Sequence, residues 1–294
     1  MDSHSNRITQ CAADMGSSQV MSDLVALVED VFEVLQRERD LTPANDAVTS
    51  MIERLKSQLR LHYEPEEIGE VLNNERIRSF HGELLAKLSA AESETELYDS
   101  RTLCATNYSG LQLITGLPYW GIYEALVGQE LAILRNYIGR DLAGMKVVFV
   151  GSGPMPLSAI LIHLYSNAEV TCLEINPAAF EASRTLLERL GLQDRVTVRQ
   201  VNGDAFDYGD YPIIFVASLV TDKAHVLEQI RCKQPDALVA VRTAEGMRQL
   251  MYETLDERLL KSQGWQILGR TTPQENLVIN STLFMQFTLH STPT

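Results

Sequence analysis

The sequence predicts an α/β fold in which an N-terminal helical bundle domain precedes a mostly parallel sheet. Three observations lead to this prediction. Apolar residues recur at helical spacing from residue 24 to residue 88. Short apolar runs rich in β-branched residues then alternate with helical patterns; they occupy residues 146–150, 170–174, 195–200, 212–217 and 236–242. Two last runs, 265–268 and 277–289, predict strands that close the sheet with an antiparallel edge.

The helical part contains three predicted helices. The residues before about Asp23 are polar, so we expect them to be frayed, with Ser22 as the N-cap of the first helix. Thr42-Pro43 supplies a cap and a first-turn proline for the second helix. The third begins near Pro65 and continues to about Leu88.

The connection to the sheet is less regular. Periodicity fails between residues 93 and 119, which indicates either a functional loop or two short helices. Helical spacing returns at residues 119–137, and the glycines at 139 and 144 mark a boundary. We therefore expect a helical cap domain over residues 1–140 and a sheet domain over residues 141–294.

The stretch from Lys146 to Ile160 joins a buried strand to a helix through Gly151-Ser152-Gly153-Pro154. In such sheets, ligands bind at the carboxyl ends of the strands, where glycines let the backbone approach the ligand. Pro156 stands where a dinucleotide-binding motif has its third glycine. The pattern therefore favours a nucleoside ligand without a pyrophosphate, such as S-adenosylmethionine, in a Rossmann-like domain.

The next two strands support this interpretation. Glu174 ends the second apolar run about 20 residues after the glycine turn, where a carboxylate reaches two ribose hydroxyls. The third strand leads to a loop with an acid, Asp204, that resembles the adenine-framing loop of Rossmann-like methyltransferases. An NAD-type cofactor and a ligand-free Rossmann domain remain alternatives. The predicted cofactor contacts are Gly151, Ser152, Gly153, Pro154, Glu174, Ile175, Asn176, Gly203, Asp204, Ala205 and Ala217.

Composition limits the class of partner. The formal net charge of −14 disfavours a nucleic-acid substrate, because phosphate contacts need clustered Lys and Arg. The four cysteines form no C-x-x-C pair, so neither a zinc site nor a disulfide framework is indicated. No apolar run is long enough for a membrane span, and the first residues lack the apolar core of a signal peptide. We therefore expect a cytoplasmic protein that binds neither membranes nor metal.

Four blocks resemble one family, the nicotianamine synthases, and within it the bacterial opine-metallophore branch of staphylopine, pseudopaline and yersinopine biosynthesis. The blocks are Val148 to Leu157, Leu173 to Pro177, Val241 to Arg248, and Val278 to Thr282. The Gly-x-Gly-Pro-x-Pro-Leu form and the Arg-Thr-x-x-Gly-Met-Arg block are not general features of methyltransferases. The resemblance covers roughly residues 70 to 287.

The resemblance implies an S-adenosylmethionine-dependent aminobutyryltransferase. Such an enzyme would transfer the 3-amino-3-carboxypropyl group to the α-amine of histidine, in the L form, and release methylthioadenosine. A partner opine dehydrogenase would act on the product, and a homodimer is one possible assembly. An ordinary small-molecule methyltransferase and a catalytically silent ligand-sensing protein on the same fold remain alternatives.

The resemblance also implies site residues. A Glu and a Tyr on the helical side of the pocket carry over to Glu92 and Tyr123, with Tyr119 as the next choice, although Glu92 lies near Glu94 and Glu96 and could belong to a solvated helix end. The predicted substrate contacts are Arg242, Asn280 and His81. Arg242 could pair with a substrate carboxylate or with a structural acid such as Glu245. A lone histidine such as His81 on an apolar helix face is more often a core residue than a ligand.

Overall fold

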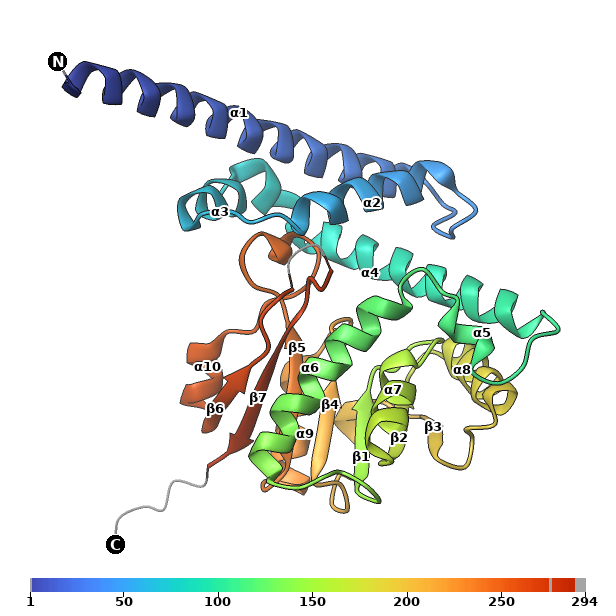
Figure 1. The fold of residues 1–294 in the computed structure, drawn as a ribbon. Coiled ribbons are helices and arrows are strands. Elements are labelled where there is room, and N and C mark those ends of the chain that lie inside the picture. The colour runs from blue at the N-terminus through green and yellow to red at the C-terminus, as the bar shows by residue number, and fades with distance from the viewer. Residues whose placement is uncertain (1, 275–276, 289–294) are drawn as a thin grey trace, which may run out of the picture.

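The computed structural model describes residues 2–274 and 277–288, with side chains from residue 19 onward (Figure 1). A helical region comes first, and its first four helices lie across one end of the sheet. Its helices are α1 (Asp2–Arg37), α2 (Asp46–Leu59), α3 (Pro65–Leu72), α4 (Glu75–Cys104), α5 (Gln112–Thr115) and α6 (Trp120–Ile138). Among the described residues, none of these helices combines the length and apolar character that a membrane span requires.

The second half of the described chain alternates strands and helices. The strands are β1 (Lys146–Val150), β2 (Glu169–Glu174), β3 (Val196–Gln200), β4 (Ile213–Val216), β5 (Leu238–Thr243), β6 (Trp265–Arg270) and β7 (Ser281–Phe287). Between them lie α7 (Leu157–Ser166), α8 (Pro177–Leu190), α9 (Lys223–Lys233) and α10 (Glu257–Ser262), with 3-10 turns η1 (Gly203–Ala205) and η2 (Gly246–Leu250).

The sheet order is β3-β2-β1-β4-β5-β7-β6. Strands β1 to β5 pair in parallel, whereas β7 runs antiparallel to both β5 and β6. This confirms the predicted α/β fold with its antiparallel edge. Because the order reverses between β1 and β4, the crevice at their carboxyl ends is the expected ligand position.

Both faces of the sheet are covered, which explains why the strands are continuous apolar runs. In β1, Val147 and Phe149 contribute to the core that also holds residues of α6, α7 and α8. Val148 and Val150 contribute to the core on the other face, with residues of α9 and α10. Figure 1 shows α6 and α7 crossing one face of the sheet.

The core of the helical region extends into the C-terminal half of the chain. Residues of α1 to α4 share one cluster with Met247 and Leu250 of η2, with Tyr252, and with Ile279. Helix α6, in contrast, packs in the sheet core. The packing thus groups α6 with the sheet, whereas the domain limits predicted at residues 140 and 141 assign it to the cap; those limits stay a prediction.

Several helix ends differ from the prediction. Helix α1 begins at Asp2, so Ser22 lies inside the helix and caps nothing. A helix extends at little cost once it is nucleated, and the polar first residues include no proline to stop it. Helix α2 is capped by Asn45, whose side chain accepts from the Ala47 N–H, and not by Thr42.

The predicted third helix is two helices. Asn74 ends the run that starts at Pro65 and caps α4, since its Oδ1 accepts from the Arg76 N–H at 3.0 Å. Helix α4 then continues to Cys104, through a stretch where the apolar periodicity fails. The reason is that polar residues of this stretch line a cavity, so this face of α4 has no apolar residues at helical spacing.

Candidate functional site

A cavity of about 680 Å³ lies between the strand ends and the helical region. The turns after β1, β2, β3 and β4 line one side of it, and residues of α2, α4 and α6 line the other. The cavity therefore lies at the predicted ligand edge of the sheet, closed over by helices from the N-terminal half.

The turn after β1 requires its two glycines. Gly151 and Gly153 have φ angles of 75° and 68°, in the left-handed region that residues with a Cβ rarely adopt. A Cβ on Gly151 would lie 2.5 Å from Val220 Cγ2, and one on Gly153 would lie 2.7 Å from Glu96 Oε2. Any side chain on Gly153 would thus displace a carboxylate that approaches this turn from α4.

Glu174 holds the same turn from the end of β2. Its Oε2 accepts from the Gly153 N–H at 2.9 Å and its Oε1 from the Asn176 N–H at 2.8 Å. Each carboxylate oxygen can accept a second hydrogen bond, so Glu174 could still receive two hydroxyls from a ligand. Next to it, the Ile175 side chain lines the cavity and is 63 % exposed, which leaves an apolar surface for a planar ring.

Glu96 of α4 faces Tyr123 of α6 across the cavity. The Tyr123 hydroxyl donates to Glu96 Oε1 at 3.0 Å. Burial, and after it the neighbouring charge of Glu92, raise the pKa of the Glu96 carboxyl to about 8. Burial also raises the pKa of Tyr123 well above its usual range. Near neutral pH, Glu96 can therefore take up and release a proton, while Tyr123 stays a hydrogen-bond donor.

A second Glu–Tyr pair lies one helical turn away. The Tyr252 hydroxyl is 3.0 Å from both carboxylate oxygens of Glu92. Burial raises the pKa of Tyr252 well above its usual range, so this hydroxyl also remains protonated. Glu92 and Glu96 are four residues apart on α4 and line the same cavity. The structure thus brings two carboxyls together, each held by its own tyrosine.

Tyr119, the second predicted tyrosine, is engaged elsewhere in the cavity wall. Its hydroxyl donates to Asp99 Oδ2 at 2.8 Å and lies 3.2 Å from Met155 Sδ. Burial raises the pKa of Tyr119 above its usual range. Because its hydroxyl donates to Asp99, Tyr119 stabilises the cavity wall next to the Tyr123 ring.

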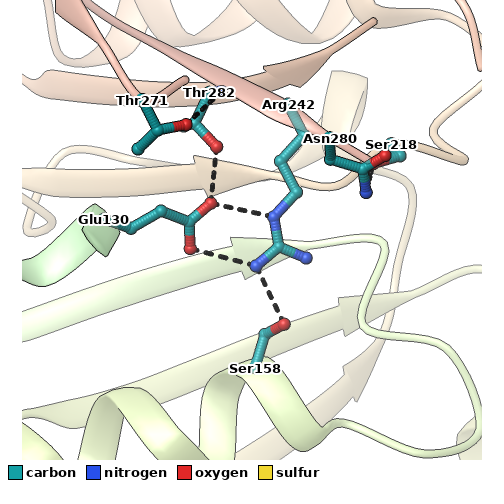
Figure 2. Close-up of polar contacts among 7 residues, drawn as sticks. All are labelled: Glu130, Ser158, Ser218, Arg242, Thr271, Asn280 and Thr282. Carbon is teal, nitrogen blue, oxygen red and sulfur yellow. Dashed lines mark hydrogen bonds and ion pairs between the residues drawn. The ribbon is translucent and has the colours of Figure 1, made fainter. Parts of the chain in front are cut away.

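Arg242 is held by a buried acid from α6 (Figure 2). Its Nε and Nη2 donate to the two oxygens of Glu130 at 2.9 and 3.0 Å, in the bidentate geometry that suits a guanidinium. Thr282 donates to the same carboxylate at 2.6 Å, and Ser158 accepts from Arg242 at 2.9 Å. The sequence offered Arg242 two kinds of partner, a substrate carboxylate or a structural acid such as Glu245. In the structure Arg242 pairs with a structural acid, and that acid is Glu130. Glu245 pairs with Arg270 instead.

Asn280 lines the cavity and holds Ser218 in its wall. Its Nδ2 donates to Ser218 Oγ at 3.0 Å, while its Oδ1 is buried and has no hydrogen-bond partner among the described residues (Figure 2). A buried acceptor without a partner is unfavourable unless a ligand satisfies it. The Oδ1 atom is closed off from the cavity as well as from solvent, so the Asn280 amide must turn before a ligand can bond to it.

Most of the predicted site residues line this one cavity: Glu92, Tyr119, Tyr123, Gly151, Ser152, Gly153, Glu174, Ile175, Asn176, Gly203, Asp204, Ala217, Arg242 and Asn280. Pro154 and Ala205 are not part of its wall. The assignment of His81 needs correction, because its Nε2 lies 2.8 Å from the Gln249 carbonyl oxygen and the ring does not reach the cavity. His81 instead ties α4 to η2, the packing role that is usual for a lone histidine on an apolar helix face.

Three residues of the site were not predicted. Glu96 carries no signal beyond its position one turn after Glu92 on the same helix. Glu130 does carry one, because it is an acid within a strongly apolar stretch of α6 and so had to find a buried partner. Tyr252 follows the Arg-Thr-x-x-Gly-Met-Arg block, but its contact with Glu92 spans 160 residues.

The described residues contain no group of three or more His, Cys, Asp and Glu arranged to hold a metal ion. Cys104, Cys172 and Cys232 are free thiols. The polar side chains that line the cavity are carboxyls, tyrosines, serine and threonine hydroxyls and amides, with a few cations.

Comparison with known proteins places these features in a family. The family model described as "Nicotianamine synthase protein" matches residues 17–291. Nicotianamine synthase 1 of Oryza sativa subsp. indica is 30% identical over 212 residues, which cover 68% of this chain and 63% of that protein. A probable nicotianamine synthase 2 of Hordeum vulgare is 28% identical over 218 residues. The chain thus spans less than two thirds of the length of the curated plant relatives it matches.

The fold also matches solved structures. A Glu-to-Gln variant of MtNAS superimposes with a TM-score of 0.77 at 20% identity, over 91% of this chain and 98% of that one. MtNAS in complex with MTA and tNA gives a TM-score of 0.75 at 21% identity, over 89% of this chain and 97% of that one. The arrangement of helical region and sheet is therefore one that occurs in MtNAS.

Proposed function

The chain belongs to the nicotianamine synthase family, and we propose that it transfers the aminobutyryl group of S-adenosylmethionine to the α-amine of L-histidine, releasing methylthioadenosine. The observation that carries this proposal is the position of Glu96. Its carboxyl is hydrogen-bonded to Tyr123 and approaches the glycine turn of the sheet. A group that accepts a proton thus lies beside the surface where the nucleoside would bind.

The cavity residues fit S-adenosylmethionine as co-substrate. Glu174 can accept two ribose hydroxyls, and the exposed Ile175 side chain can cover one face of the adenine. Solved structures of MtNAS include complexes with S-adenosylmethionine and with MTA and tNA. The acids that line the cavity also suit a cationic sulfonium ligand.

Transfer needs an unprotonated amine, because an ammonium has no lone pair with which to attack carbon. We assign the base to Glu96, since its pKa of about 8 is matched to removing a proton near neutral pH. The amine nitrogen then bonds to the γ-carbon of the methionine chain while the carbon–sulfur bond breaks, and the electron pair leaves with methylthioadenosine. Tyr123 keeps Glu96 oriented.

Histidine as acceptor follows from the opine-metallophore branch that the motif blocks resemble. A single transfer would yield a secondary amine, which an opine dehydrogenase could couple reductively to a 2-oxo acid. This places the proposed reaction one step before a reductive coupling in metallophore biosynthesis.

Product analysis tests the proposal. The purified chain is incubated with S-adenosylmethionine and L-His, D-His or L-Ala, and the released nucleoside is identified by chromatography and mass spectrometry. We expect methylthioadenosine, with L-His clearly the best acceptor. Release of S-adenosylhomocysteine would show a methyltransferase, and binding without turnover would show a ligand-sensing protein. Equal rates with L-Ala would contradict the choice of histidine.

A further inference from the structure

Helix α2 carries two cations into a cavity that is otherwise acidic. The acids that line the cavity are Glu53, Glu92, Glu96, Glu174, Asp204 and Asp222. The cationic side chains among the described lining residues are Lys56, Arg60 and Arg242. Since Arg242 is already neutralised by Glu130, α2 supplies the positive charge that remains.

The position of these cations follows from the helix period. Ile52, Lys56 and the C-cap residue Arg60 follow one another at intervals of four residues. They therefore form one stripe along α2 and its end, and all three line the cavity. The neighbouring stripe, which includes Leu55 and Leu59, is buried in the core of the helical region. Packing of the apolar stripe therefore fixes which way the cations point.

Neither cation has a strong partner in the protein. Lys56 pairs at 3.5 Å with Glu53, whose side chain is 55 % exposed, and such pairs are weak. Arg60 Nε is buried and has no hydrogen-bond partner within the part of the chain that the structure describes. Arg60 also forms no ion pair with the described residues, and a carboxylate is the group that a guanidinium in a cavity wall binds best.

Lys56 lies near the carboxyl that would deprotonate the acceptor amine. Lys56 is close enough to Glu96 for its charge to lower the pKa of that carboxyl, against the larger raising effect of burial. In an α-amino acid, the amine and the carboxylate are attached to the same carbon. A group that binds the acceptor's carboxylate is therefore expected near the base. Lys56 meets this condition, and Arg60 follows it four residues later in the cavity wall.

We propose that Lys56 and Arg60 form a carboxylate-binding subsite for the acceptor amino acid, opposite the carboxyls of α4. This inference rests on the proposed function and adds the residues that would bind the acceptor's α-carboxylate. Specificity for that carboxylate would then come from α2. This helix precedes residues 70 to 287, the part of the chain that contains the motif blocks.

Comparison of L-histidine with histamine tests the subsite, because histamine keeps the imidazole and the amine but lacks the carboxylate. We expect the wild type to prefer L-histidine in kcat/KM by about 10- to 100-fold, the range of a charge-assisted hydrogen bond. In Arg60→Gln the ratio of the two kcat/KM values should fall to within a few-fold of unity, because turnover of L-histidine is lost. Turnover of histamine and the KM for S-adenosylmethionine should stay unchanged. Arg60→Lys should restore part of the preference.

Arg54→Gln is the matched control, since Arg54 is on α2 but exposed and outside the cavity wall. The proposed subsite would be contradicted if Arg60→Gln lowered kcat/KM equally for both amines. It would also be contradicted if the variant raised the KM for S-adenosylmethionine instead. Calorimetry of both amines in the presence of methylthioadenosine gives the same comparison without turnover. Absence of methylthioadenosine release with any amine would thus count against the proposed function, and an unchanged preference would count against the subsite alone.

Discussion

The Tyr123 hydroxyl lies 3.0 Å from Glu96 Oε1, while the other oxygen of that carboxylate approaches Gly153. This contact links α6, α4 and the glycine turn after β1 in one place. Glu92, the acid predicted from helix register, is paired with Tyr252 instead. The two carboxyls of α4 therefore have different environments, and this difference can be tested.

Glu96→Gln should lower kcat by about 10²-fold or more, the usual contribution of a general base. Glutamine keeps the shape and the acceptor for Tyr123 but cannot take the proton, so affinity for S-adenosylmethionine should stay the same. Steady-state kinetics and calorimetry on the folded variant measure both quantities. Tyr123→Phe should show a smaller loss of kcat in the same direction.

Glu92→Gln and Glu94→Gln are the comparisons for this prediction. Glu94 is exposed and outside the cavity wall, so its variant should behave as the wild type. A larger loss in Glu92→Gln than in Glu96→Gln would assign the base to the Glu92–Tyr252 pair.

The raised pKa of Glu96 should make the free energy of unfolding depend on pH. The folded-state pKa of about 8 exceeds the value of 4.5 for an unperturbed glutamate, so the folded state binds the proton more tightly. Glu96 therefore destabilises the folded state increasingly as pH rises from 4.5 to 8. Urea denaturation at several pH values should show Glu96→Gln gaining stability relative to the wild type across this range. A constant difference would contradict the raised pKa.

Glu174→Ala should weaken binding of S-adenosylmethionine by about 1.5–3 kcal/mol, the range for hydrogen bonds to a charged group. Part of this loss would come from the turn itself, because Glu174 also accepts from the Gly153 N–H. Calorimetry measures the affinity, with Glu169→Ala at the other, exposed end of β2 as control. Unchanged affinity in folded Glu174→Ala protein would exclude a ribose contact.

Glu130→Ala should destabilise the fold by about 3–5 kcal/mol, because it leaves the Arg242 guanidinium buried without a counter-charge. Thr282 would lose its acceptor at the same time. Urea denaturation measures the change, and Glu130→Met combined with Arg242→Met should recover much of the loss, since the charge is then absent. A loss below about 1 kcal/mol in Glu130→Ala would mean that water reaches Arg242.

The local pattern of the sequence was sufficient for the sheet and for the nucleoside side of the cavity. Strands buried on both faces are continuous apolar runs, and the glycines of the turn are required by the backbone at those positions. Glu174 follows from its distance along the chain, because successive parallel strands end at the same edge. These features each depend on residues that are close in sequence.

The acceptor side of the cavity was decided by the tertiary structure. Tyr252 reaches Glu92 over 160 residues, and Glu130 reaches Arg242 over 112. Helix register places Glu92 and Glu96 on one face of α4, but it does not determine which tyrosine each acid meets. That choice depends on how α4 and α6 dock against the sheet and η2, which is set by packing of side chains far apart in the chain.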